Sequence, residues 1–488
     1  MKVSRFSVTR RNFLKNLAAT GVIVGSTRPA HTSTLAPAEA APVVSGSSDW
    51  PRFGCDLRNS RFNSKETQLG RENVSQLDVK WTFETDAPIQ TTPTVIGDTI
   101  YFGTLSGYQY ALESATGAQK WRHFIGYSHH PGAPTQGVRS SCQFDNGRIY
   151  FGTGLAKVHC LDADSGRELW QTQIDKNLIR NRTQIFCSPA VYKNKVYLGT
   201  SSGQAEAVCL DAETGAVRWR FYVVPDRARD AGGSIWTSPS IDETANIVYF
   251  ATGSVKSFIP ADPMLFAESL IACDADTGEM LWYDQPTPAD PFDMDYSCHP
   301  MIFDATHPSR NHEIRSCVGA GNKAGFFCFN RYTGEKLWKT MLTHATNAGG
   351  PRLNSTATAY NRVFVVSNAT GIRGRSARSV TAALHAYTGD VMWWVVNSAP
   401  IGAPVAVANH VFYQGLTDGV MEAIDAISGE QLWKHQFTDV LRGGMAIANG
   451  HLYTSIGAPS GWKLKNAIEG KKYAVYAFSP SGTADNDQ

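Results

Sequence analysis

The chain has 488 residues, of which 42% are hydrophobic and 18% are charged, so it can bury a large core and lacks the composition of a long disordered protein. Its 45 Lys and Arg residues nearly balance its 43 Asp and Glu residues. This balance provides no strongly basic surface, and we expect no nucleic acid and no anionic lipid as a partner.

Residues 1–40 have the features of an export signal. The arginine pair Arg10-Arg11 precedes a mildly apolar run at residues 17–25, and Ala38 and Ala40 form a small-x-small cleavage site. The run is too short to span a bilayer. The segment resembles a twin-arginine signal, which implies a periplasmic mature protein without a membrane span. Because no cysteine follows the cleavage site, we expect no lipid anchor.

A repeat occupies most of the remaining chain. Each unit has a β-rich run such as Ile100–Thr104, then a turn that ends in glycine, then a tryptophan four residues after that glycine. The pairs are Gly117/Trp121, Gly166/Trp170, Gly215/Trp219, Gly278/Trp282, Gly334/Trp338, Gly389/Trp393 and Gly429/Trp433. Repeated units bury their faces by stacking on each other, so we expect one large all-β domain.

Two unmatched residues complete the count of repeats. Trp81 has no turn before it, and Gly482 has no tryptophan after it. Joined, they make an eighth unit in which the N-terminal strand is the outermost strand of the last sheet, which removes exposed edges. We therefore predict an eight-bladed β-propeller at residues 73–482, with an N-terminal extension at 41–72 and a tail at 483–488.

Three of the nine cysteines occupy one position of the repeat. Cys160, Cys209 and Cys328 each lie six residues before a repeat glycine, where other units have alanine. Equivalent positions of different units cannot easily reach each other, so we predict packing residues rather than disulfides.

One end of the central channel collects polar residues. In a four-stranded meander A-B-C-D, the residues before strand A and those in the B–C turn share one face. The residues expected there are Gln90, Arg139, Trp236, Asp293 and Asp295 before A strands, and Glu206, Ser254 and Lys323 in B–C turns. An aromatic plane, carboxylates and two cations suit an anionic planar cofactor with a divalent cation.

The turns, together with the opening segment Asp49–Phe62, resemble the tryptophan-docking propeller of the quinoprotein dehydrogenases, which use pyrroloquinoline quinone (PQQ). The resemblance covers about residues 49–482 and is nearest to the polyvinyl-alcohol-dehydrogenase-like branch. The sequence contains no Cys-x-x-Cys-His haem motif, so we expect no cytochrome c domain in it.

The resemblance implies roles for the residues of the predicted face. Trp236 matches the tryptophan on which PQQ stacks, and Lys323 matches the cation that binds the quinone oxygens. Asp293 matches the aspartate that ligates calcium and takes the proton of the substrate hydroxyl, and a small shift in the match would move this role to Asp295.

Other matches are looser. Arg139 and Gln90 are expected to bind the cofactor, although the family has glutamate at the position of Gln90. Ser254, in place of an asparagine, and Glu206 are expected to ligate the metal with Asp293, the ion being calcium or another divalent or lanthanide ion. Ser141-Cys142 replaces the family's adjacent cysteine pair, so no vicinal disulfide is expected.

Two functions remain open at this point. The first is a periplasmic PQQ-dependent dehydrogenase that oxidises a small or polymeric alcohol and passes electrons to an external acceptor such as a cytochrome c. The second is a non-catalytic periplasmic propeller that acts as a scaffold or binding protein. The set Trp236, Asp293 and Lys323 favours the enzyme, whereas the altered metal ligands favour the scaffold.

Overall fold

The computed structural model describes residues 47–127, 137–175, 183–201, 205–223, 233–254, 266–287, 294–323, 325–342, 352–372, 375–457 and 473–481. Their regular structure is β-sheet, apart from one short 3-10 turn, η1 (Val74–Gln76). None of the described segments forms a helix long and apolar enough to cross a membrane. The export signal and the C-terminal tail lie outside the described residues, so both stay predictions.

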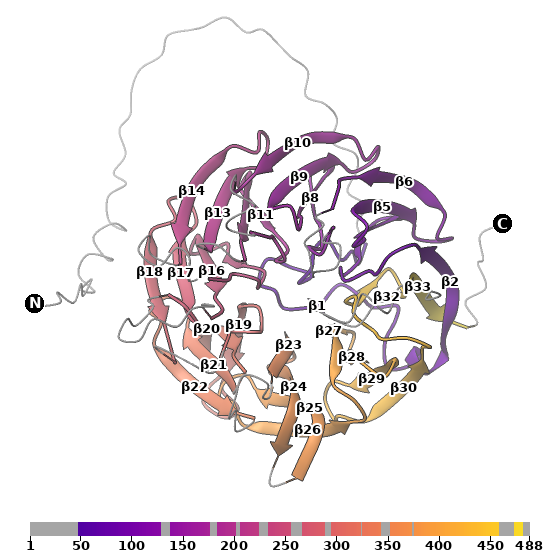
Figure 1. Ribbon diagram of the computed structural model, residues 1–488. Coiled ribbons are helices and arrows are strands. Elements are labelled where there is room, and N and C mark those ends of the chain that lie inside the picture. Colours follow the sequence, from indigo (N-terminus) through magenta and orange to yellow (C-terminus); the bar gives the residue numbers. More distant parts are fainter. Residues whose placement is uncertain are drawn as a thin grey trace, which may run out of the picture. The chain divides into compact units, whose positions relative to one another are not determined.

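The strands form eight sheets in a ring (Figure 1). Blade 1 contains β3 (Thr94–Ile96), β4 (Thr99–Gly103), β5 (Tyr108–Glu113) and β6 (Gln119–Phe124), and blade 2 contains β7 (Gln143–Asp145), β8 (Arg148–Gly152), β9 (Lys157–Asp162) and β10 (Glu168–Gln173). Blade 3 contains β11 (Ala190–Tyr192), β12 (Lys195–Gly199), β13 (Glu206–Asp211) and β14 (Val217–Tyr222), and blade 4 contains β15 (Ser240–Asp242), β16 (Ile247–Ala251), β17 (Leu270–Asp274) and β18 (Met280–Asp284).

Blade 5 contains β19 (Met301–Thr306), β20 (Ile314–Gly321), β21 (Gly325–Asn330) and β22 (Lys336–Met341), and blade 6 contains β23 (Arg352–Ala359), β24 (Arg362–Ile372), β25 (Arg375–His385) and β26 (Val391–Asn397). Blade 7 contains β27 (Ile401–Ala408), β28 (Val411–Leu416), β29 (Val420–Asp425) and β30 (Gln431–Gln436), and blade 8 contains β31 (Ala446–Ala448), β32 (His451–Ile456), β33 (Tyr473–Pro480) and β2 (Leu77–Thr85). Strands such as β11, β19, β23 and β27 lie at the inner side of their sheets (Figure 1). The eight-bladed propeller is confirmed.

Blade 8 closes the ring with strands from both ends of the chain. The N-terminal strand β2 pairs antiparallel with β33, and Trp81 lies opposite Ala477. In Figure 1 the two strands lie side by side although they are far apart in sequence. The predicted closure is therefore correct, and the N-terminal strand completes the last blade as its outermost strand.

The tryptophans dock successive blades. The indole of Trp170, on the outer strand of blade 2, lies over Gly215 in the turn of blade 3, and its Nε1 donates a hydrogen bond to Ala212 O at 3.0 Å. Gly215 has φ of 72°, and a Cβ there would lie 2.6 Å from the Trp170 ring. Both the backbone conformation and the close approach therefore require glycine in this turn.

This contact predicts a measurable stability difference between two glycine variants. Gly147 has a similar φ of 74°, but no atom lies within 4 Å of the point that a Cβ would occupy there. We expect Gly147→Ala to cost about 1 kcal/mol through backbone strain. We expect Gly215→Ala to cost about 2–4 kcal/mol, because overpacking against the Trp170 ring adds to the strain. Urea unfolding midpoints of the two variants test this, and equal midpoints would contradict the docking role.

The segment from Trp50 to Asn63 runs through the centre of the ring and bonds to every blade. Its last residues form β1 (Phe62–Asn63), which pairs parallel with β27 and lies at the centre of Figure 1. The hydrogen-bonded pairs, from blade 1 to blade 8, are Trp50/Val95, Pro51/Phe144, Arg52/Pro189, Leu57/Ile241, Arg58/Ile302, Ser60/Thr358, Arg61/Val407 and Asn63/Ile447. This segment fills the channel beside the A strands.

All nine cysteines are buried and unpaired. Cys160, Cys209 and Cys328 have no exposed surface and pack within the blades. The prediction that these three are packing residues is confirmed.

Candidate functional site

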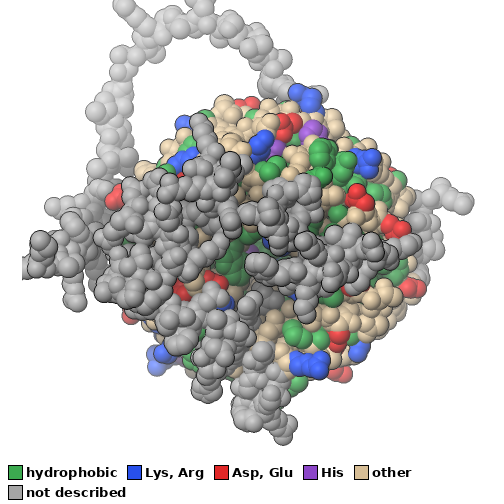
Figure 2. All heavy atoms as spheres, in the orientation of Figure 1, with side chains coloured by type: hydrophobic (Ala, Val, Ile, Leu, Met, Phe, Trp, Pro, Cys, Tyr) green, Lys and Arg blue, Asp and Glu red, His purple; other side chains and the backbone are tan. Residues whose placement is uncertain are grey.

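A pocket of about 610 Å³ lies at the centre of the ring, on the face where the chain approaches the A strands. In the orientation of Figure 1, hydrophobic side chains are visible near the centre of this face (Figure 2). The volume is within the range of small-molecule and cofactor sites.

Much of the pocket wall comes from one position of the repeat, four residues before the A strand. Successive side chains alternate in extended backbone, so equal offsets from the strand place equivalent side chains on the same side. The residues at this offset in blades 1 to 5 and 8 are Gln90, Arg139, Phe186, Trp236, Ser297 and Arg442. The sequence prediction found three of them and missed Phe186, Ser297 and Arg442, which the same offset would have identified.

Gly253 allows Trp236 and Asp295 to approach each other. Ser234, ahead of strand A, forms a β-bridge with Gly253 in the B–C turn of the same blade. A Cβ on Gly253 would lie 3.1 Å from Trp236 Nε1 and 2.5 Å from Asp295 Oδ1. The absence of a side chain therefore brings a carboxylate close to the edge of the indole.

The structure pairs Lys323 with Asp295. Lys323 is buried, and its Nζ lies 3.4 Å from Asp295 Oδ2. The backbone N–H of Ser254 donates to Asp295 Oδ1. Asp293 lies outside the described residues, so its predicted role is not tested by this geometry.

Ser254 connects Asp295 to a second carboxylate. Its hydroxyl donates to Glu268 Oε1, which also accepts the Met294 N–H at 3.1 Å. Thr287 donates to Glu268 Oε2 at 2.7 Å. The sequence prediction missed Glu268, because no pattern marks a glutamate that enters the interior from a connecting segment.

Glu206 lies in a different environment. It is not among the described residues that line the pocket, and its carboxylate accepts a hydrogen bond from Arg220 Nη1 at 2.6 Å. Burial raises the pKa of Glu206, and the Arg220 ion pair offsets part of that rise. Its role as a metal ligand stays a prediction.

Arg139 is a partly buried cation that lines the pocket. Its Nε donates to Gln90 Oε1 at 2.9 Å, and its guanidinium lies over the Phe186 ring, 4.8 Å from the centroid. Burial lowers the pKa of Arg139 to about 10. Within the described parts of the chain, Arg139 has no carboxylate partner and no acidic residue lines the pocket. The wall is therefore suited to an anion.

Ser141 and Cys142 stand where the sequence comparison expects the adjacent cysteine pair of the quinoprotein family. Ser141 lines the pocket, whereas Cys142 is buried with its Sγ 3.8 Å from Gln109 Nε2. Burial raises the pKa of the Cys142 thiol to about 12, so it is a packing residue with little thiolate character.

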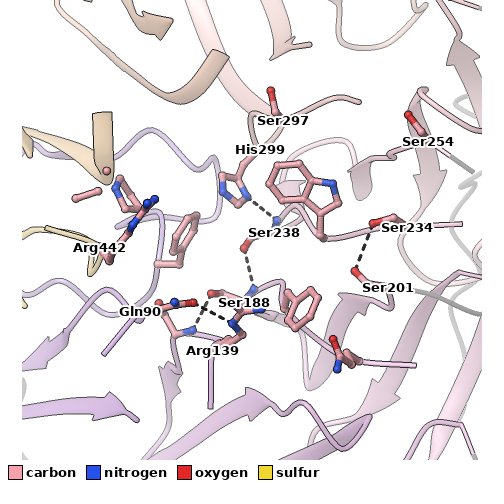
Figure 3. A pocket seen from close by; sticks show the side chains of 18 of the residues that line it. Gln90, Arg139, Ser188, Ser201, Ser234, Ser238, Ser254, Ser297, His299 and Arg442 are labelled. Carbon is pink, nitrogen blue, oxygen red and sulfur yellow. Dashed lines mark hydrogen bonds between the residues drawn. The ribbon is translucent and has the colours of Figure 1, made fainter. Parts of the chain in front are cut away.

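The floor of the pocket combines the N-terminal segment with blade 5. The rings of Phe53 and His299 meet edge to face, with centroids 4.4 Å apart, and Arg61 lies over Phe53 at 3.8 Å. Figure 3 shows His299 directed at the backbone nitrogen of Ser238, with Arg442 on another side of the pocket. Sequence patterns could not place Phe53 here, because its position depends on the path of the whole segment through the ring.

Two protein-family models match the chain. The model described as "Glucose/ethanol/alcohol dehydrogenase, beta-propeller domain" matches residues 224–358. The model described as "Outer membrane protein assembly factor BamB" matches residues 69–282 and 322–449. Both matches fall almost entirely within the propeller.

Curated relatives align over most of the chain. A polyvinylalcohol dehydrogenase from Pseudomonas sp is 25% identical over 442 residues, which is 79% of this chain and 67% of the relative. A second, from Sphingopyxis sp. (strain 113P3), is 23% identical over 460 residues, 80% of this chain and 68% of the relative. A quinohemoprotein alcohol dehydrogenase from Pseudomonas putida is 25% identical over 367 residues, but the match spans only 50% of that protein's length.

Solved structures share the fold. A quinohemoprotein alcohol dehydrogenase from Pseudomonas putida has a TM-score of 0.76 at 19% identity, covering 90% of this chain and 81% of that one. A europium-containing methanol dehydrogenase has a TM-score of 0.74 at 17% identity, covering 88% and 98%. BamB from Moraxella catarrhalis has a TM-score of 0.57 at 15% identity, covering 83% and 99%.

Proposed function

The chain belongs to the PQQ-dependent alcohol dehydrogenase family, and from this membership we propose that it binds PQQ and oxidises an alcohol. Substrate, electron acceptor and periplasmic location are part of the same proposal. The relatives named polyvinylalcohol dehydrogenase favour a secondary or polymeric alcohol, with electrons leaving to an external acceptor such as a cytochrome c.

One observation supports the cofactor most strongly. Arg139 is a partly buried guanidinium without a carboxylate partner in the described structure, on a wall that also carries Trp236. Withdrawing a charge even partly from water is costly unless an opposite charge compensates it. PQQ is planar and carries three carboxylates, so it would offer an anion to Arg139 and a ring face to Trp236. The residues present therefore fit this cofactor.

A carboxylate near Trp236 can accept the proton of the substrate hydroxyl. PQQ, when bound, supplies an electrophilic quinone carbon that accepts hydride. The proton acceptor in this proposal is Asp295, which does not line the described pocket but lies near the edge of the Trp236 indole, where Lys323 and the Ser254 N–H orient its two oxygens. We propose Asp295 for this role. In the sequence match, Asp295 is the alternative to Asp293.

The metal is supported less well than the quinone. Calcium takes about six to eight oxygen ligands, whereas the described residues place two carboxylates, Asp295 and Glu268, around Ser254. No group of three Asp, Glu, His or Cys residues that could hold an ion is found in the described part of the chain. Calcium, another divalent ion or a lanthanide stays a prediction, and no step of the reaction is assigned to it.

The scaffold alternative is favoured by the BamB model, which matches more of the chain than the dehydrogenase model does. Reconstitution separates the two functions. The purified protein is incubated with PQQ and calcium, magnesium or lanthanum, and dye reduction is followed with primary alcohols, secondary alcohols and polyvinyl alcohol. Turnover with any alcohol supports the enzyme. Absence of PQQ binding with all three ions would leave the scaffold.

Arg139→Met is expected to weaken PQQ binding by about 10- to 100-fold, because charge-assisted hydrogen bonds are worth about 1.5–3 kcal/mol. Arg139→Lys retains the charge but loses the planar contact with Phe186, so its affinity should be intermediate. Equilibrium titration by fluorescence quenching measures both variants. Unchanged affinity in Arg139→Met would remove the main support for an anionic cofactor at this wall.

A further inference from the structure

A chain of hydrogen bonds links the first five blades beneath the pocket. It uses the residues two positions before each A strand, and the backbone N–H of each donates to the side chain of the next. The bonds are Thr92 N to Ser141 Oγ at 2.8 Å, Ser141 N to Ser188 Oγ at 2.9 Å, Ser188 N to Ser238 Oγ at 2.8 Å and Ser238 N to His299 Nδ1 at 2.6 Å. Figure 3 shows the part of this chain at Ser188, Ser238 and His299.

The last acceptor differs from the others. The earlier links end on serine hydroxyls, whereas the Ser238 N–H ends on an imidazole nitrogen. Nδ1 can accept this bond only when it carries no proton. Burial lowers the pKa of His299 well below its usual range, and the positive charges of Arg61 and Arg52 lower it further. The ring therefore stays neutral, and Nδ1 remains an acceptor.

The His299 ring is itself held by the N-terminal segment. Its edge-to-face contact with Phe53 has a centroid distance of 4.4 Å at an interplanar angle of 62°. Arg61 covers Phe53 at 3.8 Å and hydrogen-bonds to Val405 O in blade 7. Contacts thus run from blade 7 through Arg61, Phe53 and His299 to Ser238.

Ser238 lies two residues after Trp236, so the bond to His299 fixes the backbone that carries the indole. Thr237 between them is also held, since its hydroxyl donates to Ala251 O at 2.6 Å. We infer that His299 is a positioning residue for Trp236, held by Phe53 of the N-terminal segment. This inference rests on the proposed function insofar as the positioned indole serves PQQ.

The test compares His299→Ala with His299→Asn. Asparagine Oδ1 occupies nearly the position of Nδ1 and can accept the Ser238 N–H, whereas alanine cannot. His410→Ala is the matched control, because His410 also contacts an aromatic ring, here stacked on Tyr360 with centroids 4.3 Å apart, but does not line the pocket.

Two readouts are measured on the full-length protein. Hydrogen exchange of the peptide containing Ser238 reports the bond without any cofactor, and PQQ titration by fluorescence quenching reports its consequence. We expect His299→Ala to speed exchange at least tenfold and to weaken PQQ binding about tenfold. His299→Asn should restore both within about threefold, and His410→Ala should change neither.

The outcomes are distinguishable. Unchanged exchange in His299→Ala, or faster exchange with unchanged PQQ affinity, would overturn the positioning role. A wild-type protein that binds no PQQ would overturn the proposed function, and the exchange data would then decide whether His299 positions the Trp236 segment. If His299→Ala does not fold, the variant Phe53→Leu is tested in its place. We expect it to speed exchange at Ser238 and to weaken PQQ binding, both by less than His299→Ala. A wild-type exchange rate in Phe53→Leu would overturn the inference.

Discussion

Trp236→Ala is expected to weaken PQQ binding by about 100-fold, roughly 3 kcal/mol, because the cofactor loses its aromatic contact and the apolar area buried against it. The expectation depends on the position of Trp236 in the pocket wall and on the close approach of its Nε1 to Gly253. Equilibrium titration with PQQ plus calcium, followed by fluorescence quenching, measures the effect.

Two further variants make this result specific. Trp236→Phe keeps a smaller ring face, so its affinity should fall between wild type and Trp236→Ala. Trp394→Phe removes a tryptophan that packs in blade 6 away from the pocket, which controls for the loss of one fluorophore. Wild-type affinity in Trp236→Ala would show that PQQ, if it binds, does not stack at this wall.

Asp295→Asn is expected to lower kcat by about 1000-fold while PQQ affinity changes only a few-fold, because general base catalysis contributes about 10²–10⁴ and the amide cannot take the proton. Asparagine has nearly the same size as aspartate and can still accept the Ser254 N–H that Asp295 receives. The measurement is dye-linked alcohol oxidation at saturating PQQ, with PQQ affinity determined separately.

Asp293→Asn is the matched comparison for this variant. If Asp295 is the base, Asp293→Asn should retain activity within about tenfold. The opposite pattern, with activity lost in Asp293→Asn and kept in Asp295→Asn, would return the role to the residue that the sequence match favoured. Loss of PQQ binding in Asp295→Asn would instead assign this carboxylate to cofactor binding.

The architecture follows from local patterns that recur along the chain. A glycine at positive φ followed four residues later by tryptophan, as in Gly215 and Trp219, specifies both a turn and the indole that docks on the next blade. The unmatched Trp81 was enough to identify the closing strand, because a ring requires a complete last blade. Such information is local, so sequence periodicity carries it.

Part of the pocket wall follows from the same periodicity. Gln90, Arg139 and Trp236 share one offset from their A strands, and extended backbone directs that offset to one side. Phe186 and Arg442 obey the same rule, and counting offsets in every blade would have included them. The sequence was therefore sufficient for residues whose direction depends on strand register alone.

Other features depend on contacts between distant segments, which no repeat encodes. The Arg220 ion pair engages Glu206 across neighbouring strands, and Lys323 meets Asp295 because two connecting segments converge. Phe53 reaches His299 because the N-terminal segment bonds to every blade in turn. Side-chain partners of this kind are determined by packing and charge pairing in the folded ring. Strand register and turn conformation, in contrast, are determined by the local amino-acid sequence.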